Sequence, residues 1–444
     1  MIDTPHQRRL EILARDRSEL PASITAFQAE QSGFDISAGV DRLDSAFDPN
    51  IHPETAIRLI GEVGFQEVVR TWLIYAGAGP CTDNDKALFH AKPETVAQEG
   101  LFHAAVRIGD RRTSVRFSPP EWGGFASPFT LKGHDGVVDL SNDSIGIRFQ
   151  GEALEPESAC LKNIAYKSDG RDRLEDQSIT VNPIQSCPMR CKFCRRQYDQ
   201  YDLFQDRQAG LAPSARDRLV NLKPEELAVH LLVKYPELNW SSNMQIAIVT
   251  GTFANFKHMF TYIEQFVDTM SRTTQGKFDP RVKQLQNIHV LSHLARTRDE
   301  MDALRSIGVK TYQDTAEIVN DDRRAALMPK ANPKNRVLLG KGELKFEDIL
   351  QSVADGVEVF GRNNYFVTLI LGLDTYDDTM RGLQGLAEAG LTYLDRPAYQ
   401  PFELGGISLY AMGVTDLIRA SFEAGRRFRT VSTTWRPESI VRER

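Results

Sequence analysis

The sequence predicts an α/β protein in which a mixed α+β domain precedes a parallel sheet built from repeated strand and helix units. The chain has 444 residues, too many for one ordinary compact core, so two domains are expected. From Ile179 onward, short apolar strands alternate with amphipathic helices, a pattern typical of a parallel sheet. Before that point, short β-prone runs separated by turn residues follow several helical stretches.

The N-terminal region is predicted to hold helices first and strands afterwards. The expected helices are Arg8–Gln31, Pro53–Ile60 and Phe65–Tyr75, the last two separated by Gly61 and Gly64. The expected strands are Leu101–Ile108 and Thr113–Phe117, which form a hairpin around Gly109-Asp110, and then Val137–Leu140 and Ile145–Phe149. No motif in this region indicates a function.

A polar segment, Lys167–Gln177, marks the expected domain boundary. We therefore predict an N-terminal α+β domain over residues 1–176, which caps the second domain or presents a substrate to it. The second domain covers 177–406. A C-terminal extension, 407–444, is expected to pack on it through Leu417, Ile418 and Phe422, which share one helical face.

Six strand and helix units are predicted in the second domain. The strands are Ser178–Asn182, Gln245–Thr250, Ile288–Leu291, Val309–Tyr312, Tyr365–Leu371 and Leu391–Leu394. The clearest helical stripe between them runs from Phe256 through Ile263 to Met270, with apolar residues at spacings of three and four.

Three of the five cysteines lie within eight residues, directly after the first of these strands. Cys187, Cys191 and Cys194 are spaced by four and three residues, which indicates metal or redox chemistry rather than packing. Three thiolates can hold a four-iron cluster and leave one iron open to a further ligand. The alternative is a zinc site, which needs a fourth ligand. The next histidine is His230, and the other cysteines, Cys81 and Cys160, lie upstream.

This C-x-x-x-C-x-x-C loop, with Phe193 before its third cysteine, resembles the signature of the radical S-adenosylmethionine (radical SAM) superfamily. The resemblance implies that the three cysteines hold a 4Fe-4S cluster and that Phe193 lies near the adenine of S-adenosylmethionine (SAM). It also implies that the six units form the open, partial (β/α)6 TIM-like barrel of that superfamily. Catalytic loops gather at the carboxyl ends of strands in such barrels, where Cys187 is expected.

The same resemblance implies further site residues. The pattern of the predicted barrel is similar to that of the branch containing biotin synthase, methylornithine synthase and the hydrogenase maturase. Gly251 and Thr252, after the second strand, occupy the place of a turn that binds the SAM amino group. Glu317, after the fourth strand, and Arg323 or Arg324 are expected to address the SAM amino acid and ribose, and Gly372 to approach the adenine. The alternatives without a function are an ordinary turn at Gly251, a solvated charged loop at Glu317 and the arginines, and barrel core at Gly372.

The absence of further motifs narrows the chemistry. The two remaining cysteines cannot supply a second cysteine-rich cluster, and no Asp-x-His-x-x-Gly cobalamin motif occurs. We therefore expect hydrogen abstraction from a small molecule, leading to rearrangement, elimination, epimerisation or dehydrogenation. One alternative is modification of a protein, peptide or RNA docked by the N-terminal domain, and another is a noncatalytic metal-binding scaffold.

Composition and charge indicate the expected partners and cellular location of the protein. A formal charge of -6 makes nucleic acid an unlikely partner, and no run of 18 apolar residues predicts a membrane span. The start lacks an apolar signal segment, and few cysteines with three clustered favour a reducing compartment, so a cytoplasmic location is expected. The resemblance further implies an external one-electron donor such as flavodoxin or ferredoxin.

Overall fold

The structure is a computed structural model, and two compact units are recognised in it. It describes residues 51–76, 102–108, 111–117, 129–134, 137–143, 146–154, 176–181, 183, 189, 191–193, 223–234, 238–241, 243–249, 253–328, 330–331, 340–396 and 409–430. The first unit comprises Met1–Ala159, Leu371–Tyr376 and Ala398–Glu423; the second comprises Cys160–Ile370, Asp377–Pro397 and Ala424–Arg444. The predicted boundaries at 176/177 and 406/407 stay predictions, as does the helix expected over Arg8–Gln31, which lies outside the described residues.

The first unit contains a five-stranded antiparallel sheet in the order β2-β1-β5-β4-β3. Its strands are β1 (Phe102–Ile108), β2 (Arg111–Phe117), β3 (Thr130–His134), β4 (Val137–Asn142) and β5 (Ile147–Leu154). The predicted hairpin is confirmed, with Ile108 opposite Arg111 at its turn. Strand β3 was not predicted, because Thr130–His134 carries only a weak apolar alternation.

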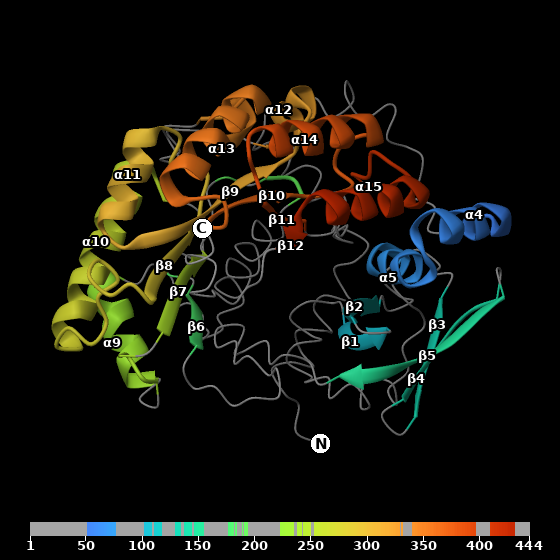
Figure 1. Cartoon of the computed structure of the whole chain (residues 1–444), viewed down its shortest axis with the longest axis horizontal. Helices are drawn as coiled ribbons and strands as arrows, with labels where there is room; N and C mark the ends of the chain where they lie inside the picture. The colour runs from blue at the N-terminus through green and yellow to red at the C-terminus, as the bar shows by residue number, and fades with distance from the viewer. Residues whose placement is uncertain are drawn as a thin grey trace, which may run out of the picture. The chain divides into compact units, whose positions relative to one another are not determined.

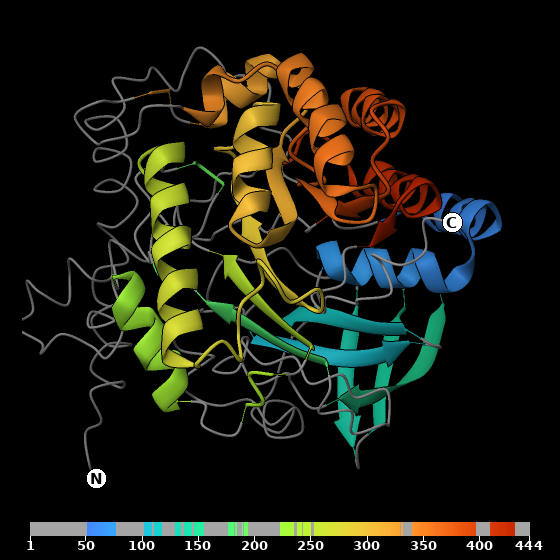
Figure 2. The same ribbon diagram turned by 60° about the vertical axis from the view of Figure 1, so that its left-hand side comes forward.

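Two helices accompany this sheet, α4 (Pro53–Val63) and α5 (Phe65–Ala76), as predicted. Gly64 separates them with a φ of +93°, a backbone conformation that glycine adopts readily. Helix α5 lies along the sheet (Figure 2) and contacts β2. The Trp72 ring is fully buried and meets Phe129 edge-on, with ring centroids 5.0 Å apart. Burial of this aromatic pair anchors α5 in the unit.

The second unit is built on a seven-stranded sheet in the order β12-β11-β10-β9-β8-β7-β6, with every neighbouring pair parallel. The strands are β6 (Asp176–Val181), β7 (Asn243–Val249), β8 (Gln286–Leu291), β9 (Val309–Glu317), β10 (Tyr365–Leu369), β11 (Tyr393–Asp395) and β12 (Arg429–Thr430). The first six overlap the six predicted strands, whereas β12 has two residues and gave no sequence signal. The mixed α/β class with a parallel sheet is therefore confirmed.

Helices connect successive strands, and those from α9 to α14 lie together along one face of this sheet (Figure 1). They are α9 (Pro224–Lys234), α10 (Phe256–Thr273), α11 (Arg298–Ser306), α12 (Asp321–Leu327), α13 (Phe346–Phe360), α14 (Tyr376–Glu388) and α15 (Val414–Arg427), with a 3-10 turn at Lys341–Glu343. The predicted stripe of α10 is buried at Ile263, Phe266 and Met270. No helix in the described part of the chain is long and apolar enough to cross a membrane.

Candidate functional site

The cysteine loop after β6 lies against the end of α12. The backbone N–H of Lys192 donates to the carbonyl oxygen of Leu327 at 2.9 Å. Cys191 and Phe193 are each 5% exposed, and Cys191 is not part of a disulfide. Cys187 and Cys194 lie outside the described residues. The hydrogen bond brings the predicted cluster loop beside the helix that follows β9, although 135 positions separate Lys192 from Leu327 in sequence number.

Glu317 ends β9 in a backbone conformation that is unusual for its residue type. Its φ is +62°, which costs free energy in any residue with a β-carbon. Its carbonyl oxygen accepts from the N–H of Ile370 at 3.0 Å, and its carboxylate forms a 2.8 Å ion pair with Lys341. The two side chains are 16% and 11% exposed. Sequence reasoning missed Lys341, because 24 residues separate it from Glu317 and no pattern links them.

Arg324 and Arg323 follow, and the structure treats them differently. Arg324 is 1% exposed, and its guanidinium donates to the carbonyl oxygens of Ala316 and Ile318, on either side of Glu317. It therefore supports the strained turn. Arg323 is partly exposed, and its backbone N–H donates to the Asn320 side chain at 3.1 Å. Of the two predicted arginines, Arg323 is thus the more exposed one.

Gly372 has a reason to be glycine that is independent of any ligand. Its φ is +106°, and a β-carbon added there would lie 3.0 Å from the Tyr410 ring. Its carbonyl oxygen accepts from the N–H of Ala411 at 2.8 Å. Its expected approach to adenine stays a prediction, and Gly251 and Thr252 lie outside the described residues.

The face of the parallel sheet turned away from the helices carries a continuous set of polar contacts, here called the polar chain: Asn287, Thr311, His289, Gln313 and Asp395. Asn287 Nδ2 lies 2.7 Å from Thr311 Oγ1, which lies 2.9 Å from His289 Nδ1. The His289 ring interacts with the Gln313 side chain, and Gln313 Nε2 donates to Asp395 Oδ2 at 2.8 Å. Sequence reasoning missed this set, although alternation of polar with apolar residues in β8 and β9 was the available signal.

Burial shifts the pKa values of one base and one acid of the polar chain in opposite directions. Loss of solvation lowers the pKa of His289 to about 4, against a smaller opposing effect of its bond to Gln313. Loss of solvation likewise raises the pKa of the Asp395 carboxyl, and the hydrogen bonds from Gln313 and Thr368 partly offset this. Both shifts favour the uncharged form, so His289 is a neutral imidazole at pH 7.

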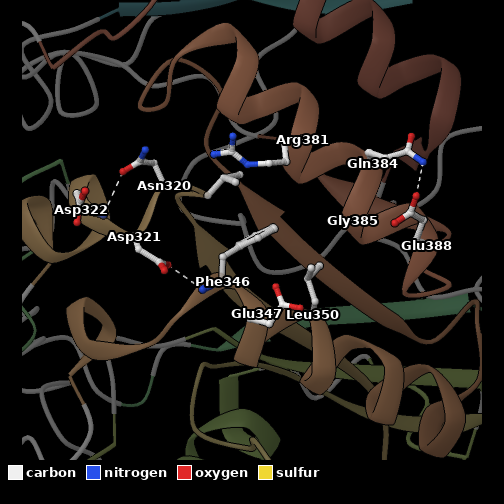
Figure 3. A pocket seen from close by; sticks show the side chains of 11 residues that line it. Asn320, Asp321, Asp322, Phe346, Glu347, Leu350, Arg381, Gln384, Gly385 and Glu388 are labelled. Atoms are coloured by element: carbon white, nitrogen blue, oxygen red, sulfur yellow. Dashed lines mark hydrogen bonds between the residues drawn. The ribbon is translucent and has the colours of Figure 1, made fainter.

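A pocket on the helical side, between α12, α13 and α14, contains none of the predicted site residues (Figure 3). Its polar groups serve the helices around it. Asn320 caps α12, Asp321 accepts from the N–H of Phe346 at 2.8 Å, and Gln384 donates to Glu388 at 2.6 Å. These contacts explain the lining as helix-end structure.

The donor set of the cysteine loop fits an iron-sulfur cluster. Cysteine thiolates are the usual ligands of such clusters, and Cys191 is buried and not part of a disulfide. The fit rests on this one described cysteine and on the spacing of all three in the sequence.

No protein-family model and no curated protein matches the chain. Among solved structures, the FeFe-hydrogenase maturase HydG from Carboxydothermus hydrogenoformans is similar at 15% identity with a TM-score of 0.38, covering 59% of this chain and 55% of its own. Coproporphyrinogen III oxidase (HemN) from Escherichia coli, described as a radical SAM enzyme, has 15% identity, a TM-score of 0.31 and coverages of 60% and 50%. The catalytic domain of a Pyrococcus furiosus chitinase has 11% identity, a TM-score of 0.26 and coverages of 47% and 69%. The match thus spans about half the length of HydG and HemN, and likenesses of this size do not define an activity.

Proposed function

We propose that the chain is a radical SAM enzyme. The observation that carries this proposal is the cysteine loop itself: three cysteines at cluster spacing directly follow β6, and Lys192 within them is bonded to α12. In the proposal the parallel sheet and its helices form a partial barrel over residues 177–406, with 1–176 as a capping or substrate-presenting domain and 407–444 as an extension.

Cys187, Cys191 and Cys194 would hold a 4Fe-4S cluster, and Phe193 would lie near the adenine of SAM. When bound, the cluster and SAM supply one chemical capability, reductive cleavage of SAM to methionine and a 5'-deoxyadenosyl radical. An external one-electron donor such as flavodoxin or ferredoxin provides the electron, and a small-molecule substrate provides the hydrogen atom.

The residues around the turn after β9 would bind the polar groups of SAM. The ion pair of Glu317 and Lys341 presents an acceptor for ammonium or hydroxyl groups beside a donor for a carboxylate. Arg323 adds a planar donor suited to a carboxylate. Arg324 is a positioning residue, because its bonds to the carbonyl oxygens of Ala316 and Ile318 fix the conformation of Glu317. Gly251, Thr252 and Gly372 complete the proposed cofactor-binding set.

The test is anaerobic reconstitution with iron and sulfide, reduction with dithionite in the presence of SAM, and detection of 5'-deoxyadenosine by mass. The variant in which Cys187, Cys191 and Cys194 are all alanine should lose both the cluster absorbance and the product. Cys160→Ala, outside the loop, is the matched control and should keep both. Zinc in place of iron, or 5'-deoxyadenosine formation that survives loss of the three cysteines, would overturn the proposal in favour of a metal-binding scaffold or adventitious chemistry.

A further inference from the structure

The polar chain begins at Asn287. The Asn287 Oδ1 atom accepts from the backbone N–H of Lys310 at 2.9 Å, which fixes the orientation of the amide. Its Nδ2 therefore donates to Thr311 Oγ1. The Thr311 hydroxyl is in turn hydrogen-bonded to His289 Nδ1, 2.9 Å away.

The second half of the polar chain ends on Asp395. Gln313 interacts with the His289 ring, and its Nε2 group donates further along the polar chain. It donates to Thr368 Oγ1 and to Asp395 Oδ2, each at 2.8 Å, and the Thr368 hydroxyl lies 3.4 Å from the same oxygen. Gln313 and Thr368 thus both donate toward the Asp395 carboxylate, and hydrogen bonds aligned in this way polarise one another.

Asp395 receives these bonds on one oxygen only. Within the described part of the chain, no ion pair joins Asp395 to a basic residue and no hydrogen bond reaches its Oδ1 atom. The side chain is partly exposed at the end of β11, whereas Asn287, Thr311 and Gln313 are at most 5% exposed. Hydrogen bonds from the protein orient this carboxylate, but no cation of the described protein neutralises it. Such a group is suited to bind the cationic group of a ligand.

The neighbouring aromatic side chains narrow the chemistry of that cation. Phe366 and Tyr393 face each other edge-on with centroids 5.7 Å apart, on the same face as His289, and both are partly exposed. The strand register places Thr368 beside Asp395 and Phe366 beside Tyr393, so the ring pair lies two residues along the strands from the carboxylate. The Arg429 guanidinium already lies over the Tyr393 ring, 5.9 Å from its centroid, so this ring does accept a cation. Aromatic faces also contact methylene groups, and the two rings together therefore suit an aliphatic amine.

We propose that Asp395 anchors the protonated amino group of a small aliphatic amine, with Phe366 and Tyr393 against its methylene chain. The identity of this amine as the substrate rests on the proposed function, but its binding does not require a cluster or SAM.

The experiment is isothermal titration calorimetry of the full chain with three probes of equal length: 1,4-diaminobutane, 4-aminobutan-1-ol and 1,4-butanediol. The expected result is one site that binds the diamine at least ten times more tightly than the diol, with the amino alcohol between them. Asp395→Asn, which keeps the shape and removes the charge, should abolish the preference. Asp377→Asn, a change of the same kind at an exposed carboxylate, should keep it.

Equal binding of diamine and diol, no binding of the diamine, or a preference that survives in Asp395→Asn would each overturn the inference. Should Asp395→Asn fail to fold, as judged by circular dichroism, the ranking of the three probes on the unmodified chain still decides. Because 5'-deoxyadenosine formation is measured separately, failure here leaves the proposed activity standing, and failure of that activity leaves amine binding standing.

Discussion

The two faces of strands β8–β10 treat polar side chains in opposite ways. On the helical face, Asp314 pairs with Arg296, and the Tyr312 hydroxyl bonds both the carbonyl oxygen of Ser292 and the N–H of Ala295. The buried Asp314 carboxylate there thus has an opposite charge within the protein. On the other face, neutral groups lead to Asp395, which has no such partner in the part of the chain that the structure describes. Polar groups on the helical face stabilise the fold, whereas those on the other face lead to the residue that we propose to bind a ligand.

The largest expected effect comes from breaking the charge pair on the helical face. Asp314→Ala leaves the Arg296 guanidinium buried without its carboxylate, and loss of one partner of a buried pair costs about 3–5 kcal/mol. The free energy of unfolding in urea measures this. Asp377→Asn, at an exposed position, should change it by less than about 0.5 kcal/mol. If Asp314→Ala lowered the free energy of unfolding as little as Asp377→Asn does, the proposed difference between the two faces would be wrong.

The next effect is a pH dependence on the other face. The folded pKa of His289, about 4, lies below the ordinary value of 6.5. The unfolded state therefore binds the extra proton first, and the stability that neutral His289 contributes is present above pH 6.5 and is lost as the pH falls toward 4. The loss amounts to roughly 3 kcal/mol over this window. Unfolding free energies measured from pH 7 to 4 should fall less steeply in His289→Gln, and identical slopes in the two proteins would contradict the assignment.

A smaller loss is expected from Tyr312→Phe. The change removes one hydroxyl and leaves the Ser292 carbonyl oxygen and the Ala295 N–H buried without that partner, at a cost of about 1–3 kcal/mol. The ring keeps its stacking on Phe360, with centroids 5.9 Å apart, so the loss isolates the hydroxyl. Chemical denaturation measures the cost, and the aminobutanol and diamine titrations should be unchanged, because this residue faces the helices.

The smallest expected effect on stability is that of Asp395→Asn. Burial raises the pKa of Asp395, so the stability linked to its protonated form is present at acid pH and is lost as the pH rises through the folded pKa. At pH 7 the charge therefore opposes folding, and the uncharged variant should be as stable as the unmodified chain or slightly more stable. Thermal unfolding at pH 7 tests this, and a marked destabilisation would instead make Asp395 a structural residue.

The sequence predicted the parts of the fold that depend on continuous patterns. Apolar runs bounded by turn residues located the six strands from β6 to β11, and a 3–4 spacing located α10. Strand β12, with two residues, is too short to carry a pattern. Among site residues, the cysteine spacing was informative because few other roles require it. Lys341 could not be predicted, because it lies in a 3-10 turn 24 residues from Glu317. The route from His289 to Asp395 could not be predicted either, because only the register of four different strands brings these side chains together.

The strand order of the parallel sheet also has a consequence for synthesis. Spatial order follows chain order from β6 to β12, so each strand pairs with the one that left the ribosome just before it. The sheet can therefore grow by addition at one edge, without waiting for distant segments. Cys187, Cys191 and Cys194 emerge near the start of this process, whereas Leu327 and Glu317 emerge much later. The nascent chain thus exposes its three thiols for as long as it takes to make β7, β8 and β9, and the loop gains its contact with α12 only after that interval.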